Sequence, residues 1–250
     1  MTEILFNNLV WYWMGIALIS FIALQFTDAP YGRHVSNKWG MLIPNKLGWI
    51  IMELPALLLC PIIYILGGNF NSSASFFVLL WLIHYVHRTL IFPVKTKTRN
   101  KQMPLAIALM AIAFNGGNGL LNGYWFAYFS DYPADYLLSP RVILGVCLFF
   151  IGMFINMKSD YYLISLRKPG ETAYKIPRGR LFKYISCPNH MGEAIEWLGF
   201  AIAVNSLPGW SFFVWSLANL IPRALSHHRW YKSHFTHYPK HRKAFIPGII

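Results

Sequence analysis

The sequence is short of charged residues and of cysteine. Asp, Glu, Lys and Arg make up only 12% of its 250 residues, whereas soluble domains carry about 25%. This shortage excludes a soluble domain with an ordinary charged surface. The three cysteines, Cys60, Cys147 and Cys187, are isolated and form no CxxC pair, which argues against a zinc site and predicts no bound metal. We expect Cys60 and Cys147 to be core residues.

Nucleotide-binding glycine motifs are also missing. The sequence has neither a GxGxxG pattern nor a P-loop, so a nucleotide, if bound, is not held by a Rossmann unit. Acidic residues number nine against 22 Lys and Arg, which gives a net charge of +13. The basic residues flank apolar segments and form no soluble domain, which argues against nucleic acid as a partner. Anionic lipid headgroups and a cytosolic anionic ligand remain as explanations.

Long apolar runs dominate what is present. Hydrophobic residues make up 56% of the chain and aromatic residues 17%, and seven runs approach the roughly 20 residues that a membrane-crossing helix needs. They predict an all-α, multi-pass integral membrane protein with one domain over residues 1–250. The seven expected transmembrane helices are 9–25, 47–66, 74–92, 104–122, 139–157, 192–206 and 207–225.

The basic residues predict the orientation of these spans. All but two of the Lys and Arg residues, Arg88 and Arg141, lie in segments that share one side of the membrane. Those segments are 26–46, 93–103, 158–191 and the C-terminal tail, 226–250, with Arg223 counted at the end of the last span. The positive-inside rule places them in the cytosol and the N-terminus outside. The membrane is then either a bacterial inner membrane or the endoplasmic reticulum.

Glu53 lies in the apolar run 47–66, which is otherwise uncharged. A carboxyl group at membrane depth costs roughly 2.5–3.5 kcal/mol on insertion scales. No cation lies within a helical turn or two of it in the sequence, so its partner comes from another segment or the group keeps its proton. A neutral Glu53 can donate a hydrogen bond. The alternative is a satisfied polar contact between helices, and we favour the functional interpretation.

The third and fourth spans carry further polar residues. His84, His87 and Arg88 fall at i, i+3 and i+4 on one helical face, with Tyr85 one turn before Arg88. Arg88 either faces the bundle interior or snorkels to the interface, and Tyr85, which is deeper, is a candidate site residue with Glu53. In the fourth span, Asn115, Asn118 and Asn122 lie among glycines, which favours helix packing over ligand binding.

The segment from 156 to 193 has the densest set of functional residue types. Asn156 and Asp160 are spaced i, i+4 as one span ends, and Asn189 and Glu193 repeat this spacing as the next begins. Basic residues of the intervening loop suit phosphates, and acids paired with Asn suit ribose hydroxyls or a carboxamide. The tail adds Arg223, His227, Arg229 and Tyr231, whereas solvated juxtamembrane charge explains Lys232, Lys240, Arg242 and Lys243.

Fragments in order along about four-fifths of the chain resemble the steroid 5α-reductase family, membrane enzymes that reduce the Δ4 double bond of 3-oxo steroids with NADPH. They are ELP (53–55), HYVHRT (84–89), N-x-x-x-D (156–160), LRKPGETAYKIPRG (166–179), N-x-x-GE-x-x-EW (189–197), RA-x-x-HHR-x-Y (223–231) and YPK-x-RKA-x-IP (238–247). Two positions depart from the family: Met52 replaces a glutamine, and Lys175 replaces an arginine.

The resemblance implies seven helices, NADPH entering from the cytosol and a lipophilic steroid in the membrane. It assigns Glu53 and Tyr85 to the 3-oxo group of the substrate. It leaves open whether Arg99 or Lys101 supplies a basic contact from the 93–103 loop. The implied cofactor residues are Arg88, Asn156, Asp160, Arg167, Tyr174, Lys175, Asn189, Glu193, Arg223, His227 and Tyr231.

The implied chemistry agrees with the residue types. Hydride addition to the β-carbon of an enone moves negative charge to the carbonyl oxygen, where a protonated Glu53 and the Tyr85 hydroxyl would stabilise it. The surplus of basic residues favours NADPH over NADH. The expected partners are the steroid and membrane lipids, with no obligate protein partner. Alternatives are a polyprenol or enoyl-CoA reductase, an isoprenylcysteine-type methyltransferase and a non-catalytic lipid-binding protein.

Overall fold

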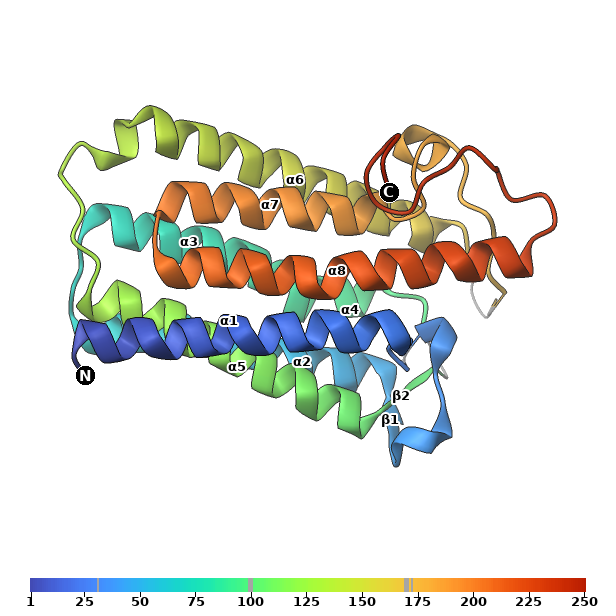
Figure 1. The fold of residues 1–250 in the computed structure, drawn as a ribbon, viewed down its shortest axis with the longest axis horizontal. Coiled ribbons are helices and arrows are strands. Elements are labelled where there is room, and N and C mark those ends of the chain that lie inside the picture. The colour runs from blue at the N-terminus through green and yellow to red at the C-terminus, as the bar shows by residue number, and fades with distance from the viewer. Residues whose placement is uncertain (31, 99–100, 169–170, 172) are drawn as a thin grey trace. The chain divides into compact units, whose positions relative to one another are not determined.

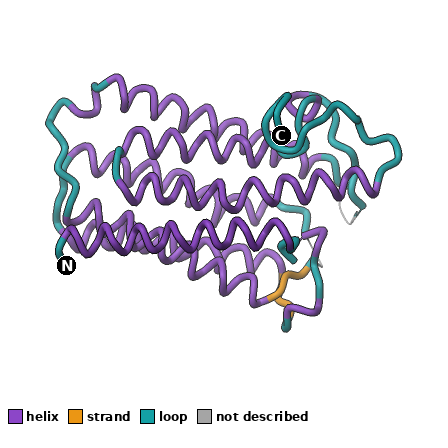
Figure 2. Tube along the Cα trace, viewed as in Figure 1, coloured by secondary structure: helices purple, strands orange, loops and turns teal. Residues whose placement is uncertain are grey.

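The computed structural model describes residues 1–30, 32–98, 101–168, 171 and 173–250, and most of them are helical (Figures 1 and 2). Arg99, a candidate cofactor contact, lies outside the described residues, as do Pro169, Gly170 and Thr172 of the 166–179 motif. The α-helices are α1 (Glu3–Phe26), α2 (Asn45–Gly67), α3 (Ser72–Val86), α4 (Phe92–Lys95), α5 (Leu105–Tyr128), α6 (Pro140–Ser165), α7 (Pro188–Val204) and α8 (Leu207–His234).

Shorter elements lie between these helices. The strands β1 (Leu42–Pro44) and β2 (Gln102–Pro104) form an antiparallel pair, with Ile43 opposite Met103. The sequence pattern did not predict this small sheet, which joins the residues just before α2 to those just before α5. The 3-10 helices are η1 (Gly32–His34), η2 (Asn37–Trp39), η4 (Tyr136–Leu138) and η5 (Arg180–Lys183), and η3 (His87–Ile91) is a π-helix.

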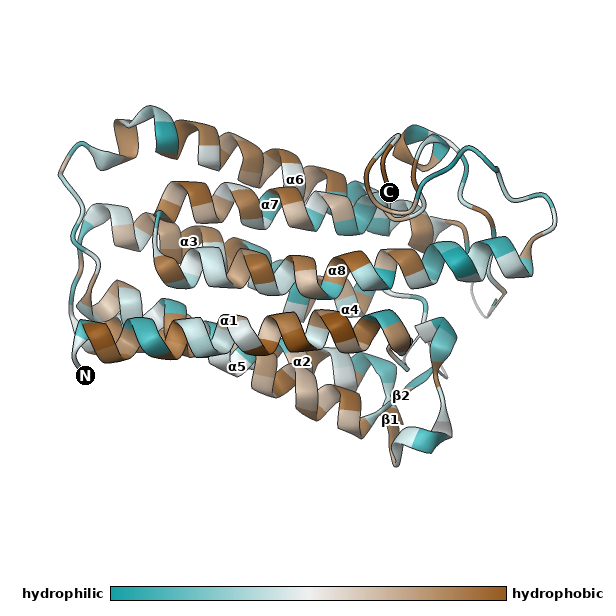
Figure 3. Cartoon of the chain, in the orientation of Figure 1, coloured by the Kyte–Doolittle hydropathy of each residue, from teal (hydrophilic) through white to brown (hydrophobic). Residues whose placement is uncertain are grey.

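Among the described residues, five helical segments are long and apolar enough to cross a membrane. This supports the prediction of a largely helical, integral membrane protein. α8 is not one of these five segments, although it is long enough. In Figure 3 its N-terminal part is mainly hydrophobic and its C-terminal end is hydrophilic. Cys60 is buried as expected, but Cys147 on α6 is exposed, so its prediction as a core residue was wrong. The five segments are Glu3–Phe26, Asn45–Gly67, Ser72–Lys95, Leu105–Tyr128 and Pro140–Ser165.

The chain groups into two compact units. Unit 1 comprises Met1–Val10, Ala29–Ile143 and Val204–Gly209, and unit 2 comprises Trp11–Asp28, Leu144–Ala203 and Trp210–Ile250. Unit 1 therefore holds α2, α3, η3 and α5, and unit 2 holds almost all of α6, α7 and α8. A single domain over the whole chain stays a prediction.

Close contact between α2 and α5 organises unit 1. A Cβ added at Gly123 would lie 2.8 Å from the Cys60 carbonyl oxygen, and one at Gly67 would lie 2.4 Å from the Ala127 side chain. Such distances are shorter than real Cβ contacts, so only glycine lets the two backbones approach this closely. α2 ends at Gly67, and the capping residue Gly68 adopts φ +71° and donates its amide to the Ile65 carbonyl, a left-handed termination that glycine favours.

Glycines also set the spacing of α6 and α7 in unit 2. A Cβ at Gly152 would lie 2.2 Å from the Glu196 amide nitrogen, and one at Gly192 would lie 2.5 Å from the Asn156 amide nitrogen. The two helices run alongside each other in Figure 1. This contact brings the polar C-terminal part of α6 against the polar N-terminal part of α7.

Candidate functional site

Glu53 lies in the middle of α2, with its side chain only 12% exposed. Asn115 of α5 donates its Nδ2 to Glu53 Oε2 at 3.2 Å and to the Met52 carbonyl at 2.7 Å. The partners of Glu53 thus come from other segments, as its isolation in the sequence required. We expected Asn115 to serve packing, and it also orients the carboxyl group.

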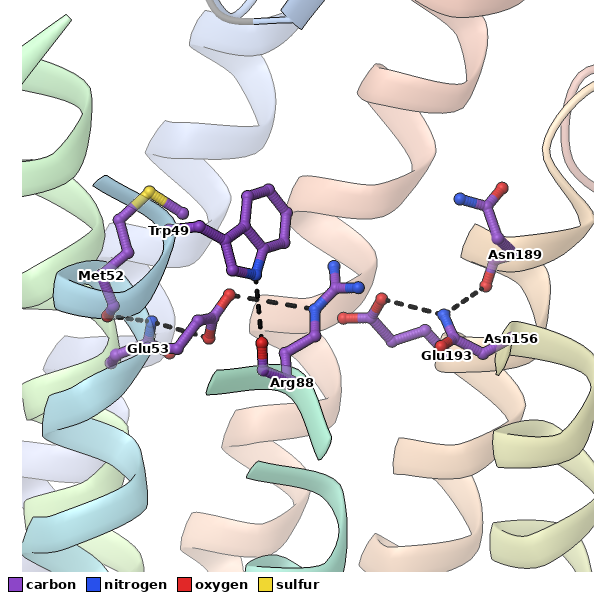
Figure 4. Close-up of polar contacts among 8 residues, drawn as sticks. Trp49, Met52, Glu53, Arg88, Asn156, Asn189 and Glu193 are labelled. Carbon is purple, nitrogen blue, oxygen red and sulfur yellow. Dashed lines mark hydrogen bonds and ion pairs between the residues drawn. The ribbon is translucent and has the colours of Figure 1, made fainter. Parts of the chain in front are cut away.

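Arg88 supplies the second contact of Glu53. Its Nε lies 3.9 Å from Glu53 Oε1, and its side chain is 13% exposed. The guanidinium lies over the rings of Trp49, at 4.7 Å from the centroid, and Phe92, at 5.0 Å. Figure 4 shows Arg88 reaching toward Glu53 beside Trp49. Arg88 therefore lies in a partly buried cation–π environment, and it does not extend into solvent.

Tyr85 lies in the last turn of α3, one turn before Arg88, and is buried. Its ring contacts Trp81, with centroids 4.9 Å apart, and His84, at 5.0 Å. Trp81 in turn donates its indole N–H to the Ala56 carbonyl of α2 at 2.8 Å. These contacts fix the part of α3 that carries Tyr85 against the helix that carries Glu53.

The other two asparagines of α5 bind backbone carbonyl groups. Asn118 donates to Phe114 O at 2.8 Å, and Asn122 donates to Asn118 O at 3.0 Å and to Pro208 O at 3.5 Å. These contacts agree with the packing role expected for them.

A second polar cluster lies in unit 2, where α6 meets α7. Asn156 donates its Nδ2 to the Asn189 carbonyl at 3.0 Å and to Glu193 Oε2 at 3.3 Å (Figure 4). Asn189 donates its own Nδ2 to Asp160 Oδ1 at 2.9 Å. Asn156 and Asp160 are buried. The two i, i+4 pairs that the sequence singled out thus form one hydrogen-bonded network.

The loop after α6 carries the predicted phosphate-binding residues. The Arg167 guanidinium lies over the Tyr174 ring at 4.6 Å, and Tyr174 contacts Trp230 at 5.1 Å. Lys175 donates to the Leu166 carbonyl at 2.9 Å and pairs with Glu171 at 2.8 Å. The hydrogen bond from the Lys168 amide, followed by that from Lys175, lowers the pKa of Glu171. Lys175 therefore holds the loop conformation, a role the sequence did not indicate.

On α8, Arg223, His227 and Tyr231 recur at every fourth residue and share one face. His227 lies against His190 of α7, with ring centroids 5.7 Å apart. Tyr231 is buried and stacks on Tyr238 at 5.2 Å. Tyr231 therefore lies in the interior of unit 2, and Arg223 and His227 are half-buried.

Arg242 was wrongly expected to be a solvated tail charge. It is only 3% exposed, donates to the Tyr238 hydroxyl at 3.3 Å and donates to the Pro177 carbonyl at 3.2 Å. Ser186 lies 2.6 Å from both the Tyr238 hydroxyl and His228 Nδ1. These contacts attach the tail to the 166–179 loop motif. Only the match of 238–247 to the family motif hinted at such a role.

The predicted residues divide between the two compact units. Unit 1 holds Glu53, Tyr85 and Arg88, and unit 2 holds the other ten. Trp49, Asn115 and Arg242 are the contacting residues that sequence reasoning missed or assigned otherwise.

Buried ionisable and amide groups inside long apolar helices define a polytopic membrane protein with a polar internal site. The profile of the family described as 3-oxo-5-alpha-steroid 4-dehydrogenase matches residues 101–250. The chain is 38% identical to 3-oxo-5-alpha-steroid 4-dehydrogenase 1 of Bos taurus, covering 98% of this chain and 97% of that protein. It is 40% identical to steroid 5-alpha-reductase DET2 of Gossypium hirsutum, over 94% and 93% of the two chains.

A third relative, 3-oxo-5-alpha-steroid 4-dehydrogenase 2 of Sus scrofa, is 41% identical over 94% of both chains. The chain belongs to the 3-oxo-5-alpha-steroid 4-dehydrogenase family. The predicted resemblance is confirmed, and so is the prediction of an oxidoreductase acting on a CH–CH group.

Proposed function

We propose that this protein reduces the Δ4 double bond of 3-oxo steroids to the 5α-reduced 3-oxo product, with NADPH as the hydride donor. The observation that carries the proposal is Glu53. Its carboxyl group lies inside an apolar helix, held by Asn115 and Arg88, in a member of a family described by this activity. A buried acid with specific hydrogen-bond and charge partners is typical of a catalytic or binding site.

Glu53 and Tyr85 are the proposed polarising pair for the 3-oxo group. Hydride addition at C5 of the enone moves an electron pair onto the C3 oxygen, and two hydrogen-bond donors aimed at this oxygen stabilise the enolate. Glu53 donates only in its protonated form, and Tyr85 donates through its hydroxyl group. Protonation at C4 then completes the reduction. The apolar helices around Glu53 exclude water, which strengthens both hydrogen bonds.

The chemistry of the unit 2 residues fits NADPH, which supplies the hydride when bound. Asp160 and Glu193 offer carboxylate acceptors, and Asn156 and Asn189 offer amides, as ribose hydroxyls and a carboxamide require. Arg167, Arg223 and the Lys175 loop supply positive charge for the phosphates. His227, Tyr174 and Tyr231 supply ring surfaces. The assignment of Arg88, which lies in unit 1, to the cofactor rests on the family resemblance alone.

We also propose seven membrane spans, with the N-terminus outside and the C-terminus in the cytosol. α7, with 17 residues, is shorter than the other proposed spans, and α8 is less apolar than they are. The partners of α8 within unit 2 supply a reason for its lower apolarity. Trp197 of α7 lies 4.4 Å from Phe212 of α8, and Trp13 of α1 lies 4.9 Å from Trp215 of α8. A helix surrounded by protein needs less apolar surface than one that faces lipid.

Purified protein in detergent, a Δ4-3-oxo steroid and NADPH test the reaction. We expect steroid-dependent NADPH oxidation and no methyl transfer from S-adenosylmethionine, which separates a reductase from a membrane methyltransferase. NADPH oxidation that does not depend on the steroid, or methyl transfer from S-adenosylmethionine, would contradict the proposal. Parallel titrations with NADH test the cofactor: equal catalytic efficiency with NADH and NADPH would contradict recognition of the 2′-phosphate.

A further inference from the structure

The π-helix η3 contains a backbone carbonyl group, that of Arg88, which receives no π-helical hydrogen bond from its own helix. In this turn the Phe92 amide donates to the His87 carbonyl, five residues earlier. The next bond of the same pattern would run from residue 93 to the Arg88 carbonyl. Residue 93 is Pro93, and proline has no backbone N–H. The carbonyl that loses this donor belongs to Arg88, whose side chain lies beside Glu53.

Trp49 of α2 supplies a hydrogen bond at this position. Its indole Nε1 donates to the Arg88 carbonyl at 3.2 Å (Figure 4). The same indole ring lies under the Arg88 guanidinium at 4.7 Å and against the Phe92 ring at 5.4 Å. One side chain therefore contacts the backbone of Arg88, its charged group and the neighbouring residue. Trp49 is also one helical turn before Glu53 on the same helix.

We propose that Trp49 is a positioning residue, whose indole N–H replaces the amide that Pro93 lacks and thereby holds Arg88 beside Glu53. π-helical turns of this kind occur mostly at functional sites. The role assigned to Glu53 rests on the proposed function, whereas the backbone replacement does not.

A double-mutant cycle between Trp49 and Pro93 tests this role. Trp49→Phe keeps an aromatic ring but removes the indole N–H, so we expect steroid kcat/KM to fall about two- to twelvefold, the range of one hydrogen bond. Pro93→Ala returns an amide to position 93. In that background we expect Trp49→Phe to cost less than about twofold, because the restored amide can donate to Arg88. Pro93→Ser provides the same amide if Pro93→Ala is recovered poorly.

Trp81→Phe is the matched control. Trp81 also donates its indole N–H to a backbone carbonyl of a neighbouring helix, Ala56, but this carbonyl has no connection with Pro93. Its penalty should be the same with proline or alanine at 93. Equal penalties for Trp49→Phe in both backgrounds would overturn the proposal, because they would assign the loss to ring packing alone.

Glu53→Gln, measured beside the cycle, separates this proposal from the proposed function. Coupling between Trp49 and Pro93 in an enzyme that is indifferent to Glu53→Gln supports the positioning role and contradicts the role of Glu53. Loss of activity in Glu53→Gln without coupling between Trp49 and Pro93 supports the role of Glu53 and contradicts the positioning role of Trp49.

Discussion

At the residue scale, the proposed reaction depends on how the Glu53 carboxyl is held. Both of its oxygens face donors, Asn115 Nδ2 on one side and Arg88 Nε on the other. Asn115 and Arg88 therefore set the position of the carboxyl group that the proposed mechanism aims at the 3-oxo oxygen. Asn115 and Trp49 matter because they set this geometry.

Glu53→Gln should abolish most turnover and leave NADPH affinity nearly unchanged. A glutamine amide is a much weaker hydrogen-bond acid than a protonated carboxyl group, so it should stabilise the enolate oxygen less. Tyr85→Phe should lower kcat by about 10²–10³-fold, the cost of removing one donor to a developing oxyanion. Steady-state rates and NADPH binding by fluorescence measure both effects. Full activity in Glu53→Gln would remove the polarising role.

Asp160→Ala and Asn189→Ala should weaken NADPH binding and leave the steroid KM nearly unmoved. The two side chains bond to each other at 2.9 Å, so their losses should not be additive in the double variant. Titration of NADPH against each variant measures this. A raised steroid KM with an unchanged NADPH KM would contradict the assignment of Asp160 and Asn189 to the cofactor. Lys240→Ala, an exposed tail residue, is the control.

At the element scale, glycine contacts decide which polar residues meet. The Gly152 and Gly192 contacts set the spacing of α6 and α7 and so bring Asn156 to Glu193. The α2–α5 contacts at Gly67 and Gly123 do the same for Glu53 and Asn115.

Gly192→Ala should weaken NADPH binding and lower the Tm. Its new Cβ would meet the Asn156 backbone nitrogen at 2.5 Å, and backbone cannot yield as a flexible side chain can, so α6 and α7 must separate. Overpacking of this kind costs about 1–3 kcal/mol. Gly15→Ala on α1 is the control, since nothing lies within 4 Å of its added Cβ. Equal behaviour of the two variants would contradict the role of this contact.

The tail network of Ser186, His228 and Tyr238 should loosen in mild acid. Burial, followed by the nearby charges of Lys232, Arg242 and Lys243, lowers the pKa of His228 from 6.5. With the folded pKa below the unfolded one, the stability contribution is complete above pH 6.5 and is lost as the pH falls below it. The wild-type Tm should therefore drop between about pH 7 and 5.5, and His228→Gln should flatten that slope. Equal slopes of Tm against pH in the wild type and His228→Gln would contradict this role of His228.

The sequence predicted helices where apolar runs have a transmembrane length, and it predicted the two i, i+4 polar pairs from their spacing. It could not predict that Asn115 bonds Glu53, because that contact depends on the register of α2 against α5. Arg242 resembled a surface charge because its neighbours are polar. Its burial arises when the tail folds back, with the Ser186 amide bonded to the Lys243 carbonyl at 2.8 Å.

At the scale of the whole molecule, membership of the 3-oxo-5-alpha-steroid 4-dehydrogenase family rests on nearly the full chain. The relatives match over more than nine-tenths of its length. Both compact units therefore fall within the matched region, and each contributes residues to the proposed reaction.

The most direct test of the central claim is isotope transfer from the cofactor to the steroid. Purified protein in detergent is given NADPH carrying deuterium at the transferable position, together with a Δ4-3-oxo steroid, and the product is analysed by mass spectrometry and NMR. We expect the wild type to form a 5α-reduced 3-oxo product with deuterium at C5, and we expect Glu53→Gln to lose this product at saturating NADPH. Deuterium elsewhere, reduction of the 3-oxo group itself, or undiminished transfer in Glu53→Gln would contradict the central claim.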